Sequence, residues 1–407
     1  PQFISGDTFV CKAIVNTPNY KVVTLDLNNR NALTNLIPET DQLLTDINRL
    51  GKNHFACFYR QQAAYTVLIF DYAGNFVKKL EFPPGSTING FRAKKEDLEA
   101  YYWVSSYTHP NVYYKMDLSS WVSSRMVELS LPYNQSSLEV TYVEYPSSDG
   151  TLVPMHIIKK KDLKMKGDLP TLLYAYGGYG TTLEPKFSEE YILWLMNGGV
   201  LAIPNIRGGG VEGSKWALEG RGINKINAVD DFIGAAEYLI ESGYTQTEKL
   251  AIKGGSHGGF LVGAAMTKRP DLFKVVVATA GAFDMVRFKK FTVGSTLTNV
   301  EEFGDPDKAD EFPFIYDISP YHNLKEGQEY PSLLLVTGAQ DDRVPPLHSY
   351  KFLAKFQSLE SSNFESYIRI NEGAGHNVNS SSLDYLETTA SIYLFIMDQF
   401  KMNLKIW

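Results

Sequence analysis

Roughly the first third of the chain contains short runs in which apolar and polar positions alternate, which is the period of β-strands. These runs are rich in aromatic and β-branched residues, turn-forming residues separate them, and none has the spacing of an amphipathic helix. Three runs resemble one another, and they lie at residues 20–26, 66–71 and 112–117. A further strand is predicted directly before each of them, at residues 8–15, 54–59 and 100–106.

Each of the three similar runs closes on an aspartate. Asp26, Asp71 and Asp117 recur at intervals of roughly 45 residues, the length of one four-stranded blade of a β-propeller. We therefore expect residues 1–132 to form an all-β, partial β-propeller domain of about three blades. A closed propeller has about 4–8 blades, so this ring would be incomplete. The alternative is a generic antiparallel β domain with accidental spacing.

The pattern changes near residue 133, where predicted strands begin to alternate with predicted helices. The strands are expected at residues 140–145, 153–159, 171–176, 200–206, 274–280, 332–338 and 367–371, with one more before Gly254. The helices are expected at residues 188–196, 230–241, 260–266, 347–357 and 383–400. This alternation predicts a mostly parallel sheet with helices on both faces over residues 133–407.

A glycine-rich turn joins one of these strands to the helix at 260–266. Gly254, Ser256 and Gly258 form the pattern G-x-S-x-G, in which a sharp strand-to-helix turn exposes the serine hydroxyl. The backbone N–H of His257 would then lie at a helix N-terminus, where it can stabilise an oxyanion. We interpret Ser256 as a nucleophile; a plain glycine-rich loop is the alternative.

Two further strand ends carry the side chains that such a serine needs. Asp341 follows the strand at 332–338, and His376 follows the strand at 367–371. The chain order Ser, Asp, His is that of α/β-hydrolases, with His376 as the base and Asp341 as the group that orients it. Separately, Asp341 could cap a turn and His376 could be an ordinary loop histidine. His257 is rejected as the base because adjacent side chains diverge on such a turn.

Length, charge and cysteine content narrow the class of protein. A chain of 407 residues exceeds the usual domain size of about 100–200 residues, so two domains are expected. The net charge is −7 and the basic residues are scattered, which argues against a nucleic-acid or membrane partner.

The two cysteines, Cys11 and Cys57, favour a reducing compartment, and we expect a cytoplasmic location. No run reaches the roughly 20 apolar residues that span a bilayer. No metal-binding motif appears, so neither metal nor cofactor is expected.

Four short motifs occur in a specific order along the chain. They are YAYGGY at 174–179, NIRGGG at 205–210, GGSHGG at 254–259 and DDRV at 341–344. Together they resemble the prolyl oligopeptidase family of serine peptidases, and the resemblance covers essentially the whole chain. It implies an α/β-hydrolase domain and a β-propeller that is seven-bladed in the family. The chain, which begins at Pro1, would correspond to about the last three blades and the main part of the hydrolase. It would lack the earlier blades and the family's N-terminal segment.

The resemblance also implies roles for residues around Ser256. Tyr176 would donate its hydroxyl to the oxyanion alongside the N–H of His257, although it could instead be a core tyrosine. Arg343, expected to be buried, would bind a substrate carbonyl. The proline pocket would be lined by Tyr179, Ala282, Leu297, Phe303 and Val344. Leu297 stands where the family typically has a tryptophan that stacks on the substrate proline.

The expected function is that of a serine endopeptidase acting on short peptides after proline, with the oligomeric state left open. Leu297 weakens the case for a strict proline preference, so a related oligopeptidase or an esterase is an alternative. Cleavage after Lys or Arg would require acidic residues in the pocket, and Glu301 and Glu302 are the only local candidates. A non-enzymatic interaction protein is the alternative from a different class; the intact Ser256, Asp341 and His376 argue against it.

Overall fold

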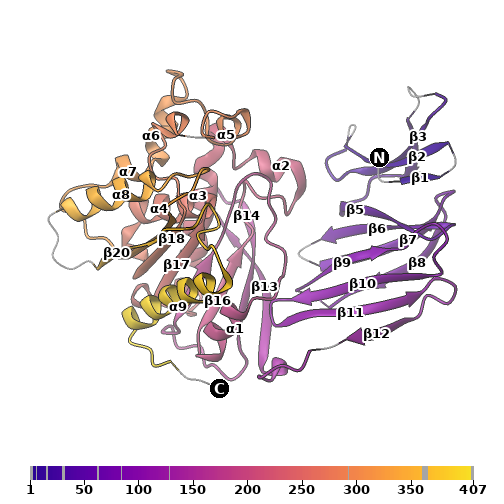
Figure 1. Ribbon diagram of the computed structural model, residues 1–407, viewed down its shortest axis with the longest axis horizontal. Coiled ribbons are helices and arrows are strands. Elements are labelled where there is room, and N and C mark those ends of the chain that lie inside the picture. Colours follow the sequence, from indigo (N-terminus) through magenta and orange to yellow (C-terminus); the bar gives the residue numbers. More distant parts are fainter. Residues whose placement is uncertain are drawn as a thin grey trace. The chain divides into compact units, whose positions relative to one another are not determined.

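The computed structural model describes residues 3–5, 7–14, 17–29, 33–61, 64–83, 85–127, 129–291, 293–359 and 365–404 (Figure 1). Contacts divide the chain into two compact units. The first unit comprises Pro1–Ser136 and Glu184–Glu189; the second comprises Ser137–Leu183 and Glu190–Trp407. Sequence analysis did not anticipate that residues 184–189 belong to the first unit. The predicted domain boundary after residue 132 stays a prediction.

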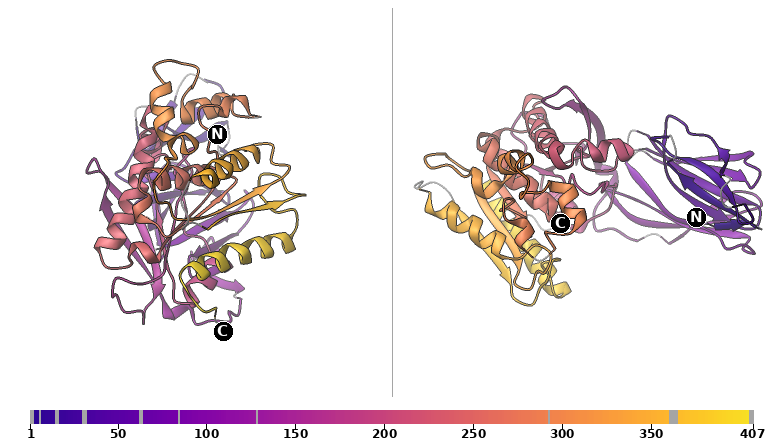
Figure 2. Two further views of the ribbon diagram at one scale, coloured as in Figure 1. Left: turned by 90° about the vertical axis from the view of Figure 1, so that its left-hand side faces the viewer. Right: turned by 90° about the horizontal axis from the view of Figure 1, so that it is seen from above.

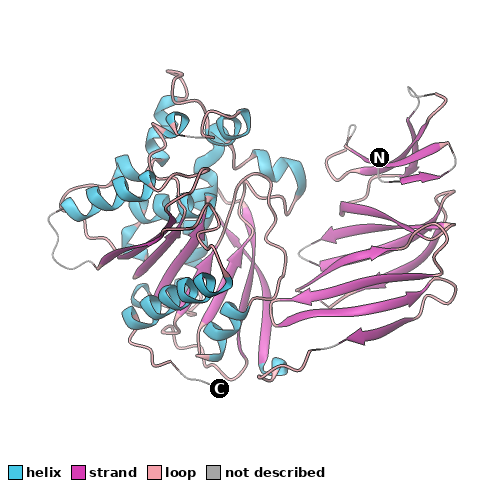
Figure 3. Ribbon diagram, in the orientation of Figure 1, coloured by secondary structure: helices cyan, strands magenta, loops and turns pink. Residues whose placement is uncertain are grey.

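The first unit consists of three four-stranded antiparallel sheets, each formed by strands consecutive in the chain (Figure 3). The first sheet contains β1 (Phe3–Ser5), β2 (Thr8–Ala13), β3 (Lys21–Asp26) and β4 (Leu33–Ile37). The second contains β5 (Leu43–Leu50), β6 (His54–Gln61), β7 (Ala64–Asp71) and β8 (Phe76–Glu81). The third contains β9 (Ser86–Arg92), β10 (Glu99–Ser106), β11 (His109–Asp117) and β12 (Ser123–Val127). No helix occurs among the residues of this unit that the structure describes up to β12.

The repeated aspartates have a shared structural role. Each closes the third strand of its sheet and accepts backbone N–H groups from the turn that follows. Asp26 binds the N–H of Asn28 at 2.8 Å, and Asp71 binds that of Ala73 at 2.9 Å. Asp117 binds that of Ser119 at 2.9 Å. The period of roughly 45 residues is therefore the distance between equivalent turns of successive sheets. The predicted strand end at Val15 lies outside the described residues.

The sheets of the first unit stack through apolar faces. One core lies between the first two sheets and contains Val22, Ile47 and Phe55 among its members. A second core joins the second and third sheets and includes Phe58 and Phe91. The middle sheet contributes to both cores, which explains why β6 is buried on both faces.

The second unit is built on one eight-stranded sheet whose spatial order is β13-β14-β16-β15-β17-β18-β19-β20. Its strands are β13 (Leu138–Pro146), β14 (Leu152–Lys160), β15 (Thr171–Tyr174), β16 (Val200–Pro204), β17 (Leu250–Gly255), β18 (Val275–Thr279), β19 (Ser332–Gly338) and β20 (Ser366–Asn371). The first two strands pair antiparallel, and β14 also pairs antiparallel with β16. From β16 to β20 all neighbours are parallel.

Helices cover both faces of this sheet (Figure 2). They are α1 (Glu189–Met196), α2 (Gly213–Leu218), α3 (Lys225–Glu241), α4 (His257–Lys268), α5 (Leu297–Phe303), α6 (Phe312–Ile318), α7 (Pro320–Asn323), α8 (Leu347–Ser358) and α9 (Ser382–Gln399). On one face α4 contacts α3 and α7, and α7 contacts α8. On the other, Trp194 of α1 lies against Tyr393 of α9, with ring centroids 6.2 Å apart. The central strands are buried from both sides, as in β18 and β19, so they read as continuous apolar runs.

Some element boundaries near the site differ from expectation. Strand β15 ends at Tyr174 rather than at 176, because the backbone leaves the sheet before Gly177, which has a φ of 68°. Helix α3 begins at Lys225 rather than at the predicted residue 230. The predicted fold class, an α/β-hydrolase domain plus a partial propeller, is confirmed by the separate four-stranded sheets of the first unit and the helix-covered, mostly parallel sheet of the second.

Candidate active site

Ser256 occupies the turn between β17 and α4 and is held in an unusual backbone conformation. Its φ and ψ are 55° and −115°, a region that residues with a side chain rarely adopt. The conformation is fixed from both sides. The N–H of Ser256 donates to the carbonyl of Thr279 at 2.8 Å, and the carbonyl of Ser256 accepts from Phe260 at 3.1 Å. The turn therefore presents the serine side chain in one direction.

The glycines around Ser256 are required by close backbone approach. A Cβ added at Gly254 would lie 2.0 Å from the carbonyl oxygen of Gly258. A Cβ at Gly258 would lie 2.6 Å from the carbonyl oxygen of Ala175. These separations are far below contact distance, so the turn can form only with glycine at both positions.

His376 and Asp341 lie on one side of Ser256. The Nε2 atom of His376 is 2.9 Å from the Oγ atom of Ser256, and its Nδ1 atom is 2.9 Å from the Oδ2 atom of Asp341. The two residues follow β20 and β19, which are adjacent parallel strands, so their loops emerge at the same edge of the sheet. The structure thus brings together three side chains that are far apart in sequence.

The Asp341 carboxylate is buried but well supplied with donors. Its Oδ1 atom accepts the N–H groups of Arg343 and Val344, both at 2.9 Å. Burial alone would raise the pKa of Asp341, but the hydrogen bonds from His376 and these N–H groups outweigh it and hold the pKa below its ordinary value. The carboxylate therefore stays charged beside His376.

Tyr176 and the start of α4 lie on the other side of Ser256. Burial raises the pKa of the Tyr176 phenol, and a hydrogen bond to the side chain of Ser256 partly offsets the increase. The backbone N–H of His257 belongs to the first turn of α4, where N–H groups have no acceptor within the helix. Two donors, one hydroxyl and one N–H, are thus available near the serine.

The His257 imidazole is directed away from Ser256. Its Nδ1 atom is 2.6 Å from the carbonyl oxygen of Tyr176, and its Nε2 atom is 3.1 Å from the Nζ atom of Lys225. Lys225 in turn forms an ion pair with Glu302. Burial and the neighbouring ammonium together hold the pKa of His257 well below its ordinary value. His257 is therefore neutral, and neither of its nitrogens faces the serine.

The residues expected to line a proline pocket differ in their environments. The rings of Tyr179, His257 and Phe303 form one cluster, with centroids 5.7 Å apart for the first pair and 5.3 Å for the second. Ala282 and Val344 are half-buried. Leu297, at the first position of α5, is 72% exposed.

Arg343 corrects one expectation. The sequence predicted a buried arginine, but Arg343 is exposed. The reason is that the two N–H groups at 343 and 344, rather than the guanidinium, turn inward to bind Asp341. The side chain of Arg343 is close enough to the Tyr176 hydroxyl to lower its pKa slightly.

A hollow of about 370 Å³ opens beside Tyr179. It is lined by Tyr179, Gly180, Ser214, Ala217, Leu218, Arg221, Thr298, Glu301 and Glu302. Leu297 is not part of this lining, whereas its neighbour Thr298 is. Both acidic residues of the lining are paired, Glu301 with Arg221 and Glu302 with Lys225.

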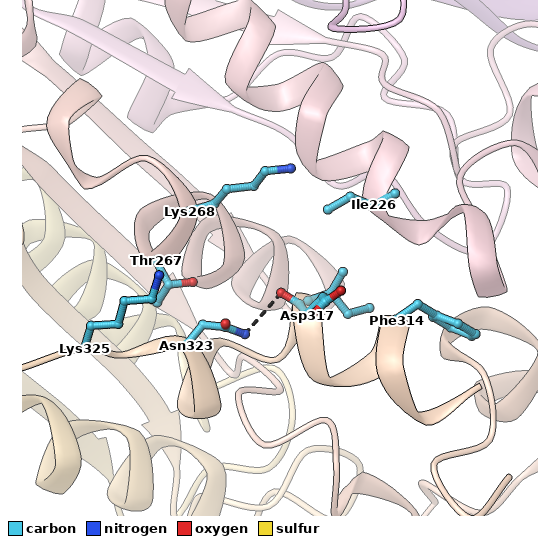
Figure 4. Close-up of a pocket in the computed structure, with 8 residues that line it drawn as sticks. Ile226, Thr267, Lys268, Phe314, Asp317, Asn323 and Lys325 are labelled. Atoms are coloured by element: carbon cyan, nitrogen blue, oxygen red, sulfur yellow. Dashed lines mark hydrogen bonds between the residues drawn. The ribbon is translucent and has the colours of Figure 1, made fainter. Parts of the chain in front are cut away.

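A second hollow, of about 420 Å³, lies at the opposite end of α4 from the serine (Figure 4). Thr267 and Lys268 contribute to it from the last turn of α4, whereas Ser256 precedes the first turn. The Nζ atom of Lys268 forms an ion pair with Asp230 at 2.5 Å. This hollow is therefore not part of the arrangement around Ser256.

Lys225 and Asn299 also lie at this site, although the sequence carries no signal for either. Lys225 starts a helix and carries no motif, so no pattern marks it as buried. Asn299 accepts a hydrogen bond from the Tyr179 hydroxyl at 2.6 Å and also has no sequence signature. Glu302 was considered only as an acidic residue for a basic substrate, and its pairing with Lys225 was not foreseen.

Neither a metal-holding cluster nor a membrane-spanning helix is found in the described part of the chain. No group of three or more His, Cys, Asp or Glu side chains there is arranged to hold a metal ion. Among the same residues, no helix combines the length and the hydropathy that crossing a membrane requires.

Comparison with known families decides the classification. The model of the prolyl oligopeptidase family matches residues 185–403, and that of its N-terminal β-propeller domain matches residues 3–127. The chain belongs to the prolyl oligopeptidase family. The resemblance inferred from the four sequence motifs is thereby confirmed.

Individual relatives agree with this classification. The chain is 36% identical over 403 residues to the prolyl endopeptidase of Elizabethkingia miricola, covering 98% of this chain and 56% of that protein. It is 32% identical to the dual function macrocyclase-peptidase POPB of Amanita bisporigera, with the same coverage. A solved prolyl endopeptidase structure superposes with a TM-score of 0.93 at 34% identity, covering 98% of this chain and 59% of the other. The chain thus spans a little over half the length of these relatives.

Proposed function

We propose that the protein is a serine endopeptidase that hydrolyses short peptides on the carboxyl side of proline through an acyl-enzyme formed on Ser256. One observation carries the proposal. His376 lies between Ser256 and Asp341, with 2.9 Å from Nε2 to the serine hydroxyl and 2.9 Å from Nδ1 to the carboxylate. This is the hydrogen-bonded chain that activates a serine nucleophile. A cytoplasmic location is a further part of the proposal.

In the acylation step, the Oγ atom of Ser256 attacks the scissile carbonyl carbon while its proton passes to Nε2 of His376. The Asp341 carboxylate stabilises the imidazolium that forms. Collapse of the tetrahedral adduct breaks the C–N bond, and His376 returns the proton to the leaving amine. The products of this step are the amine fragment and an ester on Ser256.

In the deacylation step, water replaces the amine. The oxygen of the water attacks the ester carbon while His376 takes one of the water protons. The second tetrahedral adduct then expels the Oγ atom of Ser256. The proton on His376 returns to the serine oxygen. The free acid leaves and the starting state is restored.

Each tetrahedral adduct carries an oxyanion that requires donors. The Tyr176 hydroxyl, whose burial-raised pKa is lowered in part by the neighbouring Ser256 side chain, and the backbone N–H of His257 are the two donors we assign to it. Such donors stabilise the transition state more than the substrate because charge develops on the oxygen only during reaction.

The pocket favours an apolar P1 residue over a basic one. Tyr179 and Phe303 provide aromatic surface next to His257. The two acids that could attract a P1 lysine or arginine are neutralised by Arg221 and Lys225. We therefore assign P1 contacts to Tyr179, Ala282, Leu297, Phe303 and Val344, and the exposed Arg343 to a substrate carbonyl.

Labelling with a fluorophosphonate probe tests the enzyme class. The parent protein should be labelled covalently and Ser256→Ala should not, because the probe reacts only with an activated serine. Chromogenic peptides with proline, alanine or arginine at P1 then test specificity, and proline should give the highest kcat/KM. Absence of labelling in the folded parent would favour a non-enzymatic interaction protein. Labelling with a preference for arginine, or for simple esters, would overturn the proline assignment.

A further inference from the structure

The side chain of His257 has partners at both ring nitrogens although it lies directly next to the nucleophile. It is 3% exposed, and its neighbours Lys225 and Glu302 are 0% and 2% exposed. The acyl-transfer steps use only the backbone N–H of His257. A buried histidine, lysine and glutamate that the chemistry does not use call for another role.

The partners of His257 define its tautomer. The carbonyl oxygen of Tyr176, 2.6 Å from Nδ1, can only accept, so Nδ1 must carry the hydrogen. The ammonium of Lys225, 3.1 Å from Nε2, can only donate, and it lies nearer to Nε2 than the Glu302 carboxylate does at 3.5 Å, so Nε2 offers its lone pair to the ammonium. Glu302 pairs with Lys225 and thereby balances its charge in a buried setting. The three residues hold the imidazole neutral with a single orientation.

The loop that carries Tyr176 fits closely against this imidazole. A Cβ added at Gly178 would lie 2.4 Å from Cδ2 of His257, so the backbone of this glycine rests on the ring. Gly177, between Tyr176 and Gly178, has a φ of 68° and reverses the direction of the chain. The Tyr176 and His257 rings are 5.5 Å apart between centroids. Because β15 ends at Tyr174, Tyr176 is not held by the sheet and depends on these contacts.

We propose that His257 is a positioning residue for Tyr176: its Nδ1–H binds the Tyr176 carbonyl and thereby keeps the Tyr176 hydroxyl beside Ser256. Lys225 and Glu302 support this role by fixing the tautomer. The inference rests on the proposed function, in which Tyr176 donates to the oxyanion. It assigns a task to the imidazole that is separate from that of the His257 backbone.

Two substitutions separate the bonds that the imidazole makes. The side-chain amide of asparagine lies near the position of Nδ1, so His257→Asn can still donate to Tyr176. The longer glutamine reaches the position of Nε2, so His257→Gln can accept from Lys225 but leaves the Tyr176 carbonyl unbound. A displacement of a catalytic group by about 1 Å can cost about 10²-fold. We expect kcat to fall about 10–100-fold in His257→Gln with KM changed less than about threefold, and to be at least tenfold higher in His257→Asn.

A double-mutant cycle with Tyr176→Phe distinguishes positioning from a general structural effect. If His257 acts through the Tyr176 hydroxyl, His257→Gln should lower kcat less than about threefold once that hydroxyl is absent. An equal loss in both backgrounds would overturn the proposal. His156→Gln provides the matched control, since His156 is also buried in the second unit, on β14. Its effect should be the same in both backgrounds.

The tautomer itself can be measured in the parent protein, which avoids any folding failure of the variants. With ¹⁵N-labelled histidine only seven residues give signals, and His257→Asn identifies that of His257. A hydrogen on Nδ1 and an unprotonated Nε2 are expected, whereas a hydrogen on Nε2 would overturn the proposal.

The kinetics of Tyr176→Phe distinguish failure of this inference from failure of the proposed function. If Tyr176→Phe alone leaves kcat unchanged, the oxyanion assignment is wrong and so is this inference. If Tyr176→Phe lowers kcat but the cycle is additive, only this inference fails.

Discussion

Two histidines lie next to Ser256, and the hydrogen-bond partners of their ring nitrogens differ. In His376, Nδ1 is bonded to the Asp341 carboxylate and Nε2 to the Ser256 hydroxyl. In His257, Nδ1 is bonded to the Tyr176 carbonyl and Nε2 to an ammonium. The Asp341 carboxylate can stabilise an imidazolium that forms on His376 during the reaction, whereas burial and the ammonium beside His257 hold the pKa of His257 well below its ordinary value. The charge next to a histidine, rather than its distance in sequence from a serine, decides whether it can serve as a base.

Removing the serine or its base gives the largest expected effect. Ser256→Ala and His376→Ala should each lower kcat by about 10⁴–10⁶-fold, because the three side chains act as a unit. The double variant should be little worse than either single variant. Steady-state cleavage of a proline peptide measures these losses. Substantial activity in His376→Ala, lost on further substitution of His257, would show that the two histidines had been assigned the wrong way round.

The next largest effect concerns the unfolding free energy that depends on the buried Lys225–Glu302 pair beside His257. Glu302→Ala leaves the ammonium of Lys225 buried without a counter-ion, which should cost about 3–5 kcal/mol of unfolding free energy. Glu301→Ala is the matched control, because its pair with Arg221 is partly exposed and should contribute only about 0–1 kcal/mol. Urea denaturation of the two variants measures the difference. Equal and small losses would mean that Lys225 is not charged in the folded protein.

Tyr176→Phe addresses the oxyanion side alone. Loss of one oxyanion donor typically lowers kcat by about 10²–10³-fold, and we expect this range with the fold and KM nearly unchanged. Measuring Tyr176→Phe and Ser256→Ala on the same substrate compares the loss of kcat from the oxyanion donor with the loss from the nucleophile. A change confined to KM would identify Tyr176 as a wall of the pocket and not as a donor.

The smallest expected effect concerns Leu297. The residue is highly exposed, so Leu297→Trp can be accommodated without displacing the core. A flat aromatic face is worth about 0.5–1.5 kcal/mol beyond area burial, and kcat/KM for proline relative to alanine at P1 should rise accordingly. No gain in a stably folded variant would place Leu297 outside the pocket, consistent with its absence from the lining of the hollow beside Tyr179.

The sequence predicts the architecture of both units because periodic features repeat locally. The spacing of Asp26, Asp71 and Asp117 reflects equivalent turns, each of which forms within a few residues of chain. Likewise, Ser256 and Asp341 follow apolar strand runs, and the carboxyl ends of parallel strands meet at one edge of a sheet. Local pattern and sheet geometry were therefore sufficient to predict which side chains converge.

The supporting contacts could not be predicted in the same way. Lys225 and Glu302 are separated by 77 residues, and neither belongs to a motif. A lysine is ordinarily exposed, so only its tertiary surroundings reveal that it is buried and paired. Tyr176 was placed in a strand because its apolar neighbours continue the run of β15, whereas the φ of Gly177 ends the strand earlier. Side-chain pairing across distant elements leaves no periodic trace in the sequence.

The backbone conformation of Ser256 lowers the stability of the folded protein at the same position that supplies the nucleophile. A residue with a Cβ at a φ of 55° and ψ of −115° carries strain on the order of 1–3 kcal/mol, which glycine would largely relieve. Selection for heat resistance without selection for turnover would therefore favour Ser256→Gly, which lacks the nucleophilic hydroxyl. Laboratory evolution of this protein toward a higher Tm needs an activity screen at every round, because the change to glycine that relieves this strain also removes the nucleophile.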